Sequence, residues 1–220
     1  MKIIITGASG MVGHAVLIEC LEATIVKEVL LINRRPIELH HPKIKELLVA
    51  DFEQIPSHAQ NLAGYDACFH CMGVSVMGLS EEAYTKMTFG YSKILFDTLY
   101  KSTPGMIVTY ISGVGTDSSE KGNSMWARVK GKTENYLLHL GFKDAYAFRP
   151  GIILPEKGVK SKTGWYNTLY VLFRPIFPLF KRMKNTIGSS DLGKAMLLLL
   201  KSPNEKKVFE PYQIKQLANK

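Results

Sequence analysis

Three glycines near the start of the chain are spaced as in loops that bind phosphate. Gly7, Gly10 and Gly13 stand in the stretch GASGMVG, after a short apolar run and before a segment of helical spacing that extends to Glu22. Glycine lets the backbone turn tightly against a pyrophosphate, and the start of the next helix offers unpaired N–H groups. The pattern predicts a dinucleotide site, and a glycine-rich turn without a ligand is the alternative. The residues expected around the pyrophosphate are Gly7, Ser9, Gly10, Met11, Val12 and Gly13.

Two arginines follow the second apolar run of the chain. A domain that prefers NAD(H) usually carries a carboxylate here for the ribose hydroxyls, whereas this chain has Asn33, Arg34 and Arg35. Guanidinium groups can pair with a 2′-phosphate and stack on an adenine ring. We therefore expect NADP(H) as the preferred cofactor, with NAD(H) possible, and a solvated basic turn is the alternative.

Further candidates follow the third and fourth apolar runs. Asp51 precedes Phe52, and its carboxylate could accept a hydrogen bond from the adenine amino group or simply cap a turn. Cys71, Met72 and Gly73 are expected to pass beneath the dinucleotide, where the glycine permits close approach. We expect Cys71 to pack rather than to act as a redox thiol.

Apolar runs alternate with segments of helical spacing along the chain. This alternation predicts an α/β fold, a doubly wound parallel sheet of the Rossmann type, in one domain spanning residues 1–220. After Arg149 the alternation gives way to aromatic and basic residues, and residues 150–190 are expected to form a short helical cap on the substrate side. A helix is expected to start near Ser189. The predicted strands are Ile3–Ile5, Val29–Ile32, Leu47–Ala50, Ala67–His70, Met106–Ile111 and Ala145–Phe148.

The chain resembles the short-chain dehydrogenase/reductase superfamily, particularly its atypical, epimerase-like members. The resemblance rests on the glycine motif, on Ile111-Ser112-Gly113, on Val129-Lys130-Gly131, and on Phe148-Arg149-Pro150-Gly151. In that superfamily a serine orients the carbonyl, a tyrosine exchanges a proton, and a lysine four residues later lowers the tyrosine pKa and holds the ribose.

Ser112 and Lys130 match two of these catalytic positions, but Trp126 occupies the place of the tyrosine. An indole is a hydrogen-bond donor that does not ionise usefully. Catalysis then needs another group, such as a water or one of the tyrosines, or the protein binds the cofactor without turnover, or the site serves packing alone. The stretch around Trp126 also resembles a branch of small bacterial members with tryptophan here. The candidate tyrosines are Tyr84, Tyr91, Tyr110 and Tyr166.

The sequence favours an NADP(H)-binding oxidoreductase that acts on a small carbonyl or quinone. A non-catalytic, NADP(H)-responsive sensor or interaction protein is the alternative. A sugar-nucleotide epimerase or dehydratase is less favoured, because such enzymes usually bring a larger C-terminal substrate region and use the tyrosine. We predict no metal site.

Charge and cysteine content bear on partners and location. Residues 1–110 carry 9 Lys/Arg against 11 Asp/Glu, and residues 111–220 carry 19 against 8. Charge alone does not predict a specific nucleic-acid partner. The aromatic and basic segment Lys160–Lys184 favours a lid or subunit contact over peripheral membrane contact. Three cysteines and the lack of a secretory signal pattern indicate the cytoplasm, and the oligomeric state is not predicted.

Overall fold

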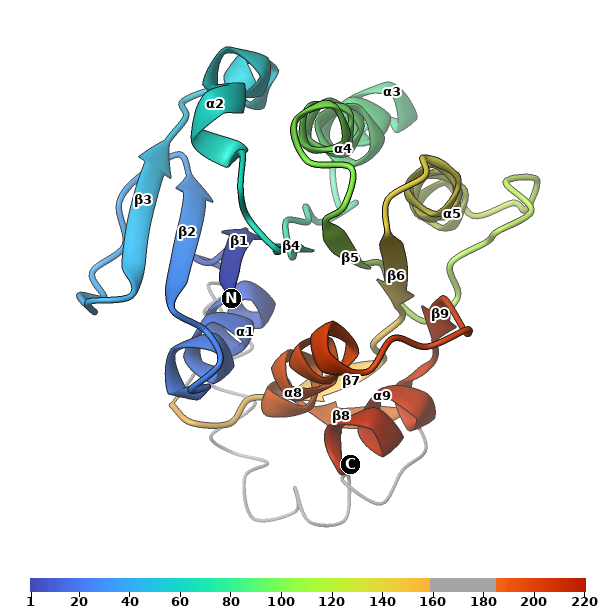
Figure 1. The fold of residues 1–220 in the computed structure, drawn as a ribbon. Helices are drawn as coiled ribbons and strands as arrows, with labels where there is room; N and C mark the ends of the chain where they lie inside the picture. Colours follow the sequence, from blue (N-terminus) through green and yellow to red (C-terminus); the bar gives the residue numbers. More distant parts are fainter. Residues whose placement is uncertain (159–184) are drawn as a thin grey trace.

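The computed structural model describes residues 1–158 and 185–220. At its centre is a parallel sheet of seven strands in the order β3-β2-β1-β4-β5-β6-β9 (Figure 1). The chain winds outward in opposite directions from β1, so a crevice is expected at the carboxyl ends of β1 and β4. The strands are β1 (Lys2–Thr6), β2 (Glu28–Asn33), β3 (Ile44–Leu48), β4 (Ala67–His70), β5 (Ile107–Ile111), β6 (Asp144–Phe148) and β9 (Val208–Phe209).

Helices cover both faces of this sheet. Figure 1 shows α1, α8 and α9 on one face and α2, α3, α4 and α5 on the other. A separate hydrophobic core fills the space under each set of helices. The helices are α1 (Met11–Glu22), α2 (Ala59–Leu62), α3 (Glu81–Thr85), α4 (Tyr91–Ser102), α5 (Met125–His139), α8 (Ser189–Lys201) and α9 (Pro211–Ala218), with a 3₁₀ turn η1 (Phe52–His58) and a π turn η2 (Lys86–Gly90).

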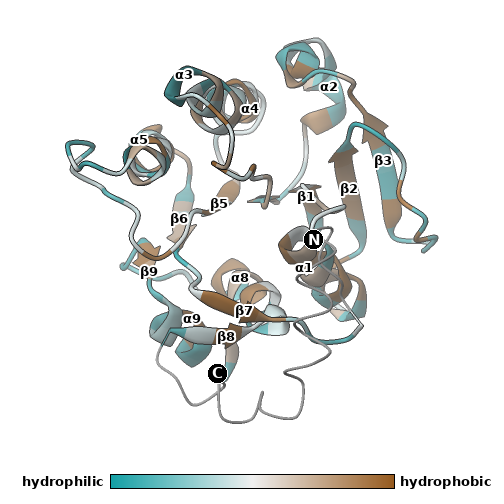
Figure 2. Ribbon diagram, turned by 180° about the vertical axis from the view of Figure 1, so that it is seen from behind, coloured by the Kyte–Doolittle hydropathy of each residue, from teal (hydrophilic) through white to brown (hydrophobic). Residues whose placement is uncertain are grey.

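The strands are apolar because both faces of the sheet are covered. In β1, Ile3 and Ile5 pack into the core beneath α1 and α8, while Ile4 packs into the core on the opposite face. Successive side chains of a strand point to opposite faces, so a strand buried on both sides reads as a continuous apolar run. The hydropathy colouring in Figure 2 shows the same apolar character in β2 and β5. The predicted doubly wound α/β fold is confirmed.

Two strands differ from the prediction. The third strand is Ile44–Leu48, earlier than the predicted run 47–50, because it is the edge strand and only partly buried, so its hydropathy pattern is weak. The last strand of the central sheet, β9 (Val208–Phe209), was not predicted, since two residues are too few to give a periodic pattern. The helix predicted to start near Ser189 is α8 and begins at that residue.

The predicted cap falls partly outside the described residues. Its flanks, β7 (Ile152–Leu154) and β8 (Thr186–Gly188), pair in parallel as a small second sheet. Residues 159–184, which hold most of the predicted cap, Tyr166 and the segment considered for membrane contact, lie outside the described part of the chain. Every helix within residues 1–158 and 185–220 is too short or too polar to cross a bilayer.

A buried histidine ties β1 and β4 to α4. His70 at the end of β4 is fully buried, with Nδ1 2.7 Å from Thr6 Oγ1 and Nε2 2.8 Å from Ser92 Oγ. The Ser92 hydroxyl donates its hydrogen to the carbonyl of Thr88, so it must accept from Nε2–H of His70. Nδ1 of His70 is therefore the acceptor for the Thr6 hydroxyl. Burial lowers the pKa of His70 to about 3, which keeps the ring neutral.

We expect His70 to make the stability of the fold depend on pH. The pKa of about 3 in the folded protein lies below the ordinary value of 6.5. The contribution of a neutral buried histidine is therefore complete above pH 6.5 and is lost as the pH falls toward 3. Between pH 7.5 and pH 5 this loss amounts to about 2 kcal/mol.

Urea unfolding at both pH values of the wild-type protein, His70→Gln and the exposed control His40→Gln checks this expectation. His70→Gln should be less stable at pH 7.5 but lose less free energy of unfolding on acidification. An equal loss in His70→Gln and the wild type would contradict the assignment.

Candidate functional site

A cavity of about 440 Å³ lies where the carboxyl ends of β1, β2, β3 and β4 meet. Most of the residues predicted to bind a dinucleotide line it, namely Gly7, Ser9, Gly10, Arg34, Asp51, Phe52, Cys71, Met72 and Gly73. The predicted residues that do not line it are Met11, Val12, Gly13, Arg35 and Lys130. The lining residues absent from the predicted set are Ile32, Asn33, Ala50, Val74, Met87 and Tyr91.

The glycine loop is packed too tightly to accept side chains. Gly7 has φ +73°, and a Cβ there would lie 2.7 Å from the carbonyl oxygen of Cys71. A Cβ on Gly13 would lie 2.2 Å from the carbonyl oxygen of Gly7. The loop therefore requires glycine at both positions for structural reasons, whatever binds above it.

The start of α1 has no side-chain cap. The N-cap residue is Gly10, which has no side chain to accept a hydrogen bond, and the first turn of the helix contains no acidic residue. The first N–H groups of a helix lack partners within the helix, and the helix dipole makes this end favourable for an anion. Since Gly7, Ser9 and Gly10 line the cavity, this end of α1 adjoins it.

Cys71 forms part of the cavity wall as a neutral thiol. Burial raises its pKa to about 12, so the sulfur stays protonated at physiological pH. The thiolate is the reactive form of cysteine, and the structure thus favours packing over redox chemistry at this position.

The two arginines after β2 differ in position. Arg34 lines the cavity, whereas Arg35 is exposed and does not. The turn that carries them is held by Glu46 on β3, whose Oε1 accepts hydrogen bonds from the amide of Asn33 (3.2 Å) and from the backbone N–H of Ile37 (3.0 Å). Glu46 was not predicted from the sequence, because only the pairing of β2 with β3 brings it to this turn.

The far wall of the cavity combines a carboxylate with two aromatic rings. Asp51 caps the η1 turn, where its Oδ1 accepts from Glu53 N at 3.0 Å. The alternative role of Asp51 as a turn cap is thus confirmed, and its second oxygen has no protein partner in the described part of the chain. The rings of Phe52 and Tyr91 lie 5.9 Å apart. Tyr91, from a distant helix, carries no local sequence signal that would place it here.

A second group of predicted residues lies on α5 and at the end of β5. The predicted residues Trp126 and Lys130 share one face of α5 with Glu134, because the three are spaced four residues apart. The Lys130 ammonium donates to the carbonyl of Ser112 at 2.5 Å. The Trp126 ring packs against the loop after β5, 3.4 Å from where a Cβ on Gly115 would lie.

The Ser112 hydroxyl belongs to a buried charged network. Its Oγ donates to Glu134 Oε1 and lies 3.2 Å from the carbonyl oxygen of Phe148. Glu134 has no exposed surface and receives two hydrogen bonds from Arg149, one of them from Nε at 3.0 Å. Because the only hydrogen of the hydroxyl is used by Glu134, Ser112 has none left for a substrate carbonyl in this arrangement. Sequence reasoning missed Glu134.

The electrostatics of Lys130 and of the candidate tyrosines differ. Burial lowers the pKa of the Lys130 ammonium from its usual value, while the nearby Glu134 carboxylate opposes this shift. Tyr84 and Tyr110 are both buried, and burial raises the pKa of each phenol. Among the tyrosines named as candidates, only Tyr91 lines the cavity within the described residues, and it does so beside Phe52.

Comparison with known proteins gives three kinds of match. Residues 3–115 match the model of the NAD dependent epimerase/dehydratase family. Protein HTATIP2 of Rattus norvegicus is 26% identical over 166 residues, which are 74% of this chain and 67% of that protein.

Solved structures share the fold at low sequence identity. WbmH from Bordetella bronchiseptica, solved in complex with NAD+, superposes with a TM-score of 0.70 at 18% identity, covering 99% of this chain and 79% of that one. A short chain dehydrogenase from Burkholderia cenocepacia, solved in complex with NADP, gives a TM-score of 0.70 at 12% identity, with 99% and 91% coverage. At these identities the likeness establishes the fold alone.

We expect the Glu134–Arg149 pair to make the largest contribution to stability among the residues on α5 and at the end of β5. Removing Glu134 leaves the Arg149 guanidinium, 13% exposed, without its main partner. Breaking a buried pair by deleting one partner costs about 3–5 kcal/mol, whereas an exposed pair contributes about 0–1 kcal/mol.

Urea unfolding of Glu134→Ala and of Glu81→Ala, which removes the exposed partner of Arg128, measures the contrast. Similar losses of unfolding free energy in both variants would refute the expectation.

Proposed function

The chain belongs to the NAD dependent epimerase/dehydratase family, and on this basis we propose that it binds NADP(H) and acts as an oxidoreductase on a small carbonyl or quinone. The observation that carries the proposal is the cavity over Gly7 and Gly10, with Arg34 on its wall. Residues 33–35 at the end of β2 include no carboxylate to select the ribose hydroxyls of NAD(H).

The residues of the cavity fit a dinucleotide. The space above Gly7 and Gly10 adjoins the uncapped start of α1 and suits a pyrophosphate. Asp51 and Phe52 would receive the adenine, and Met72 and Gly73 would lie beneath the ribose next to it. Ser9, Met11 and Val12 would contact the pyrophosphate through their backbone N–H groups.

Arg34 is the group that we assign to the 2′-phosphate. It is exposed and lines the cavity, and a guanidinium pairs well with a phosphate. Glu46 would support this recognition by holding the turn through Asn33 and Ile37. Arg35, which does not line the cavity, would contribute only through its long-range charge.

Lys130 is the group that we assign to proton donation. A bound reduced nicotinamide supplies a hydride, and the chain must then supply a proton to the developing alkoxide or phenolate. Trp126 does not ionise, and the Ser112 hydroxyl is occupied by Glu134. Burial lowers the Lys130 pKa, which makes its ammonium a better acid, and an ammonium bonded to one carbonyl retains two further hydrogens.

A second candidate function is a non-catalytic, NADP(H)-responsive protein. The inward hydrogen bond of Ser112 and the tryptophan at position 126 favour it, since neither group offers the chemistry of the superfamily's serine and tyrosine. Loss of a positioned acid costs about two to four powers of ten in rate, and a reactive quinone tolerates this loss better than an unactivated ketone does. Turnover of a quinone therefore distinguishes the two functions.

Calorimetric titration with NADPH and NADH tests the proposed binding. We expect the wild-type protein to bind NADPH more tightly, and Arg34→Ala to lose about tenfold in NADPH affinity with little change for NADH, because one charged hydrogen bond is removed. Arg35→Ala is the matched control and should lose less. The absence of binding by either dinucleotide would overturn the proposed function.

Substitutions at positions 126 and 130 test the proton-donor assignment. We expect Trp126→Tyr to raise the rate of phenanthrenequinone reduction by about 10²-fold over the Trp126→Phe control, because the new phenol lies one helical turn from Lys130. Lys130→Met should abolish turnover in the wild-type background and in the Trp126→Tyr background. Turnover of Lys130→Met at the wild-type rate would contradict the assignment of Lys130 as the proton donor.

A further inference from the structure

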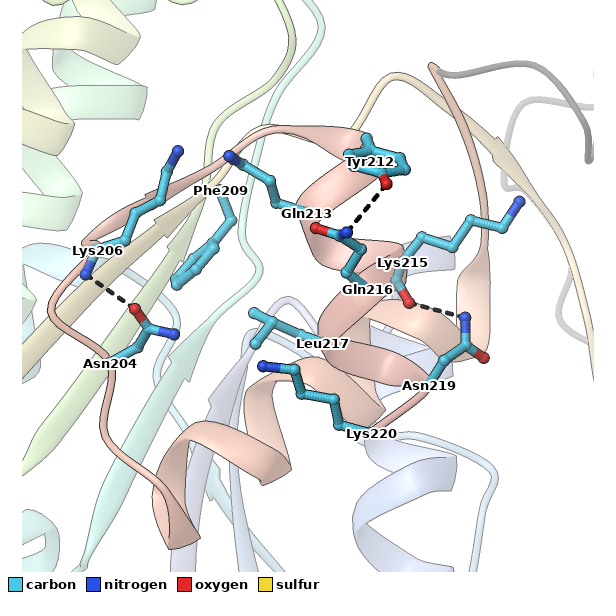
Figure 3. Close-up of a pocket in the computed structure, with 10 residues that line it drawn as sticks. All are labelled: Asn204, Lys206, Phe209, Tyr212, Gln213, Lys215, Gln216, Leu217, Asn219 and Lys220. Atoms are coloured by element: carbon cyan, nitrogen blue, oxygen red, sulfur yellow. Dashed lines mark hydrogen bonds between the residues drawn. The ribbon is translucent and has the colours of Figure 1, made fainter.

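A second hollow lies at the opposite edge of the sheet from the dinucleotide cavity. It measures about 620 Å³ and is formed by β9, the turn before it and helix α9 (Figure 3). The strand order separates β9 from β1 by three strands, so the two sites are distinct. A volume of this size is typical of small-molecule sites.

The charged side chains that line this hollow are all of one sign. Its lining contains three lysines and no carboxylate side chain. Among the described residues, neither Lys206 nor Lys220 forms an ion pair, and both are exposed. In Figure 3 the side chains of Lys206, Asn204 and Lys220 surround Phe209 and Leu217, which form an apolar floor. Two unpaired ammonium groups around one hollow favour an anionic ligand.

Two amide side chains present hydrogen-bond donors because their oxygens are already used. Asn204 Oδ1 accepts from the backbone N–H of Lys206 at 2.9 Å, and Gln213 Oε1 accepts from the backbone N–H of Glu210 at 3.0 Å. A backbone N–H can only donate, so these bonds fix which end of each amide is oxygen. The NH₂ groups of Asn204 and Gln213 are thereby left as oriented donors.

The other end of the hollow carries an aromatic ring and an acceptor. Tyr212 is 58% exposed, and its hydroxyl oxygen accepts from Gln216 Nε2 at 3.0 Å, which leaves the phenol hydrogen free. The same bond leaves Gln216 Oε1 as an acceptor. This end can therefore stack a planar ring and accept a hydrogen bond from it, while the Lys206 end receives negative charge.

We propose that this hollow binds a phosphate monoester of a small heterocycle, a nucleoside monophosphate, independently of the dinucleotide cavity. The phosphate lies against the Lys206 ammonium and the NH₂ group of Gln213, whose nitrogen ends point to the same side of Phe209 in Figure 3, and the base stacks on Tyr212. The Lys220 ammonium, on the other side of Phe209, adds to the positive potential of the hollow. A longer polyanion is disfavoured, because the exposed Glu205 and the half-buried Glu210 flank the donor group in the chain.

The test is a ¹H–¹⁵N NMR titration of the full chain with AMP, which locates binding even though AMP can also enter the dinucleotide cavity. We expect shifts of the Gln213 and Tyr212 amides that saturate, and a loss of about tenfold in the affinity read from them in Lys206→Gln with Lys220→Gln. The control, Lys101→Gln with Lys121→Gln, removes the same charge at exposed positions elsewhere and should retain the affinity. Inorganic phosphate should bind the same amides more weakly than AMP does.

Three outcomes would overturn this proposal. The first is the absence of shifts at Gln213 and Tyr212 up to about 10 mM AMP, because binding that needs a higher concentration is far weaker than that of most specific sites. The second is an equal loss of affinity in both lysine pairs, which would indicate general charge attraction. The third is much tighter binding of a single-stranded DNA 12-mer at these amides, which would indicate a nucleic-acid surface. Shifts at Gly10 report the dinucleotide cavity separately, so failure here leaves the proposed function untouched.

Discussion

The close approach of the first glycine loop to the end of β4 is the constraint on which the site depends. Gly7 lies against the Cys71 carbonyl and Gly13 against the Gly7 carbonyl, with no room for a Cβ at either position. Thr6 precedes Gly7 and His70 precedes Cys71, and these two preceding residues share a buried hydrogen bond. The neutral histidine thus fixes β1 to β4 at the point where the loop begins, and the shape of the cavity above follows from that spacing.

A buried ion pair has the corresponding role at the end of β5. Glu134 and Arg149 join α5 to β6, and the Ser112 hydroxyl donates into the same network. This arrangement holds Lys130 against the carbonyl of Ser112, in surroundings that lower its pKa. Stability and chemistry are linked here, because the network that positions the lysine also removes the hydroxyl hydrogen of Ser112 from use by a substrate.

The sequence predicted those features that depend on local pattern. The buried strands β1, β2 and β4 are continuous apolar runs, and the glycine loop follows directly from its spacing. The edge strand β3 was placed too late because half-exposed residues give a weak pattern. Glu46 and Glu134 were missed, since their importance comes from partners that only the packed sheet and helices bring close. Tyr91 was one of four candidate tyrosines, and only the packing of α4 shows that it lies beside Phe52. The predicted cap could be compared only at β7 and β8, because residues 159–184 lie outside the described part of the chain.

The most direct test of the central claim is the location of bound NADPH in solution. A ¹H–¹⁵N NMR titration of the full chain with NADPH reports each backbone amide separately. We predict the largest shifts at Gly10, at Arg34 and at Gly73, where the cavity wall would contact the pyrophosphate and the adenosine, with a smaller response at Lys130. Shifts confined to residues outside this cavity, or no shifts at saturating NADPH, would contradict the assignment of this cavity as the cofactor site.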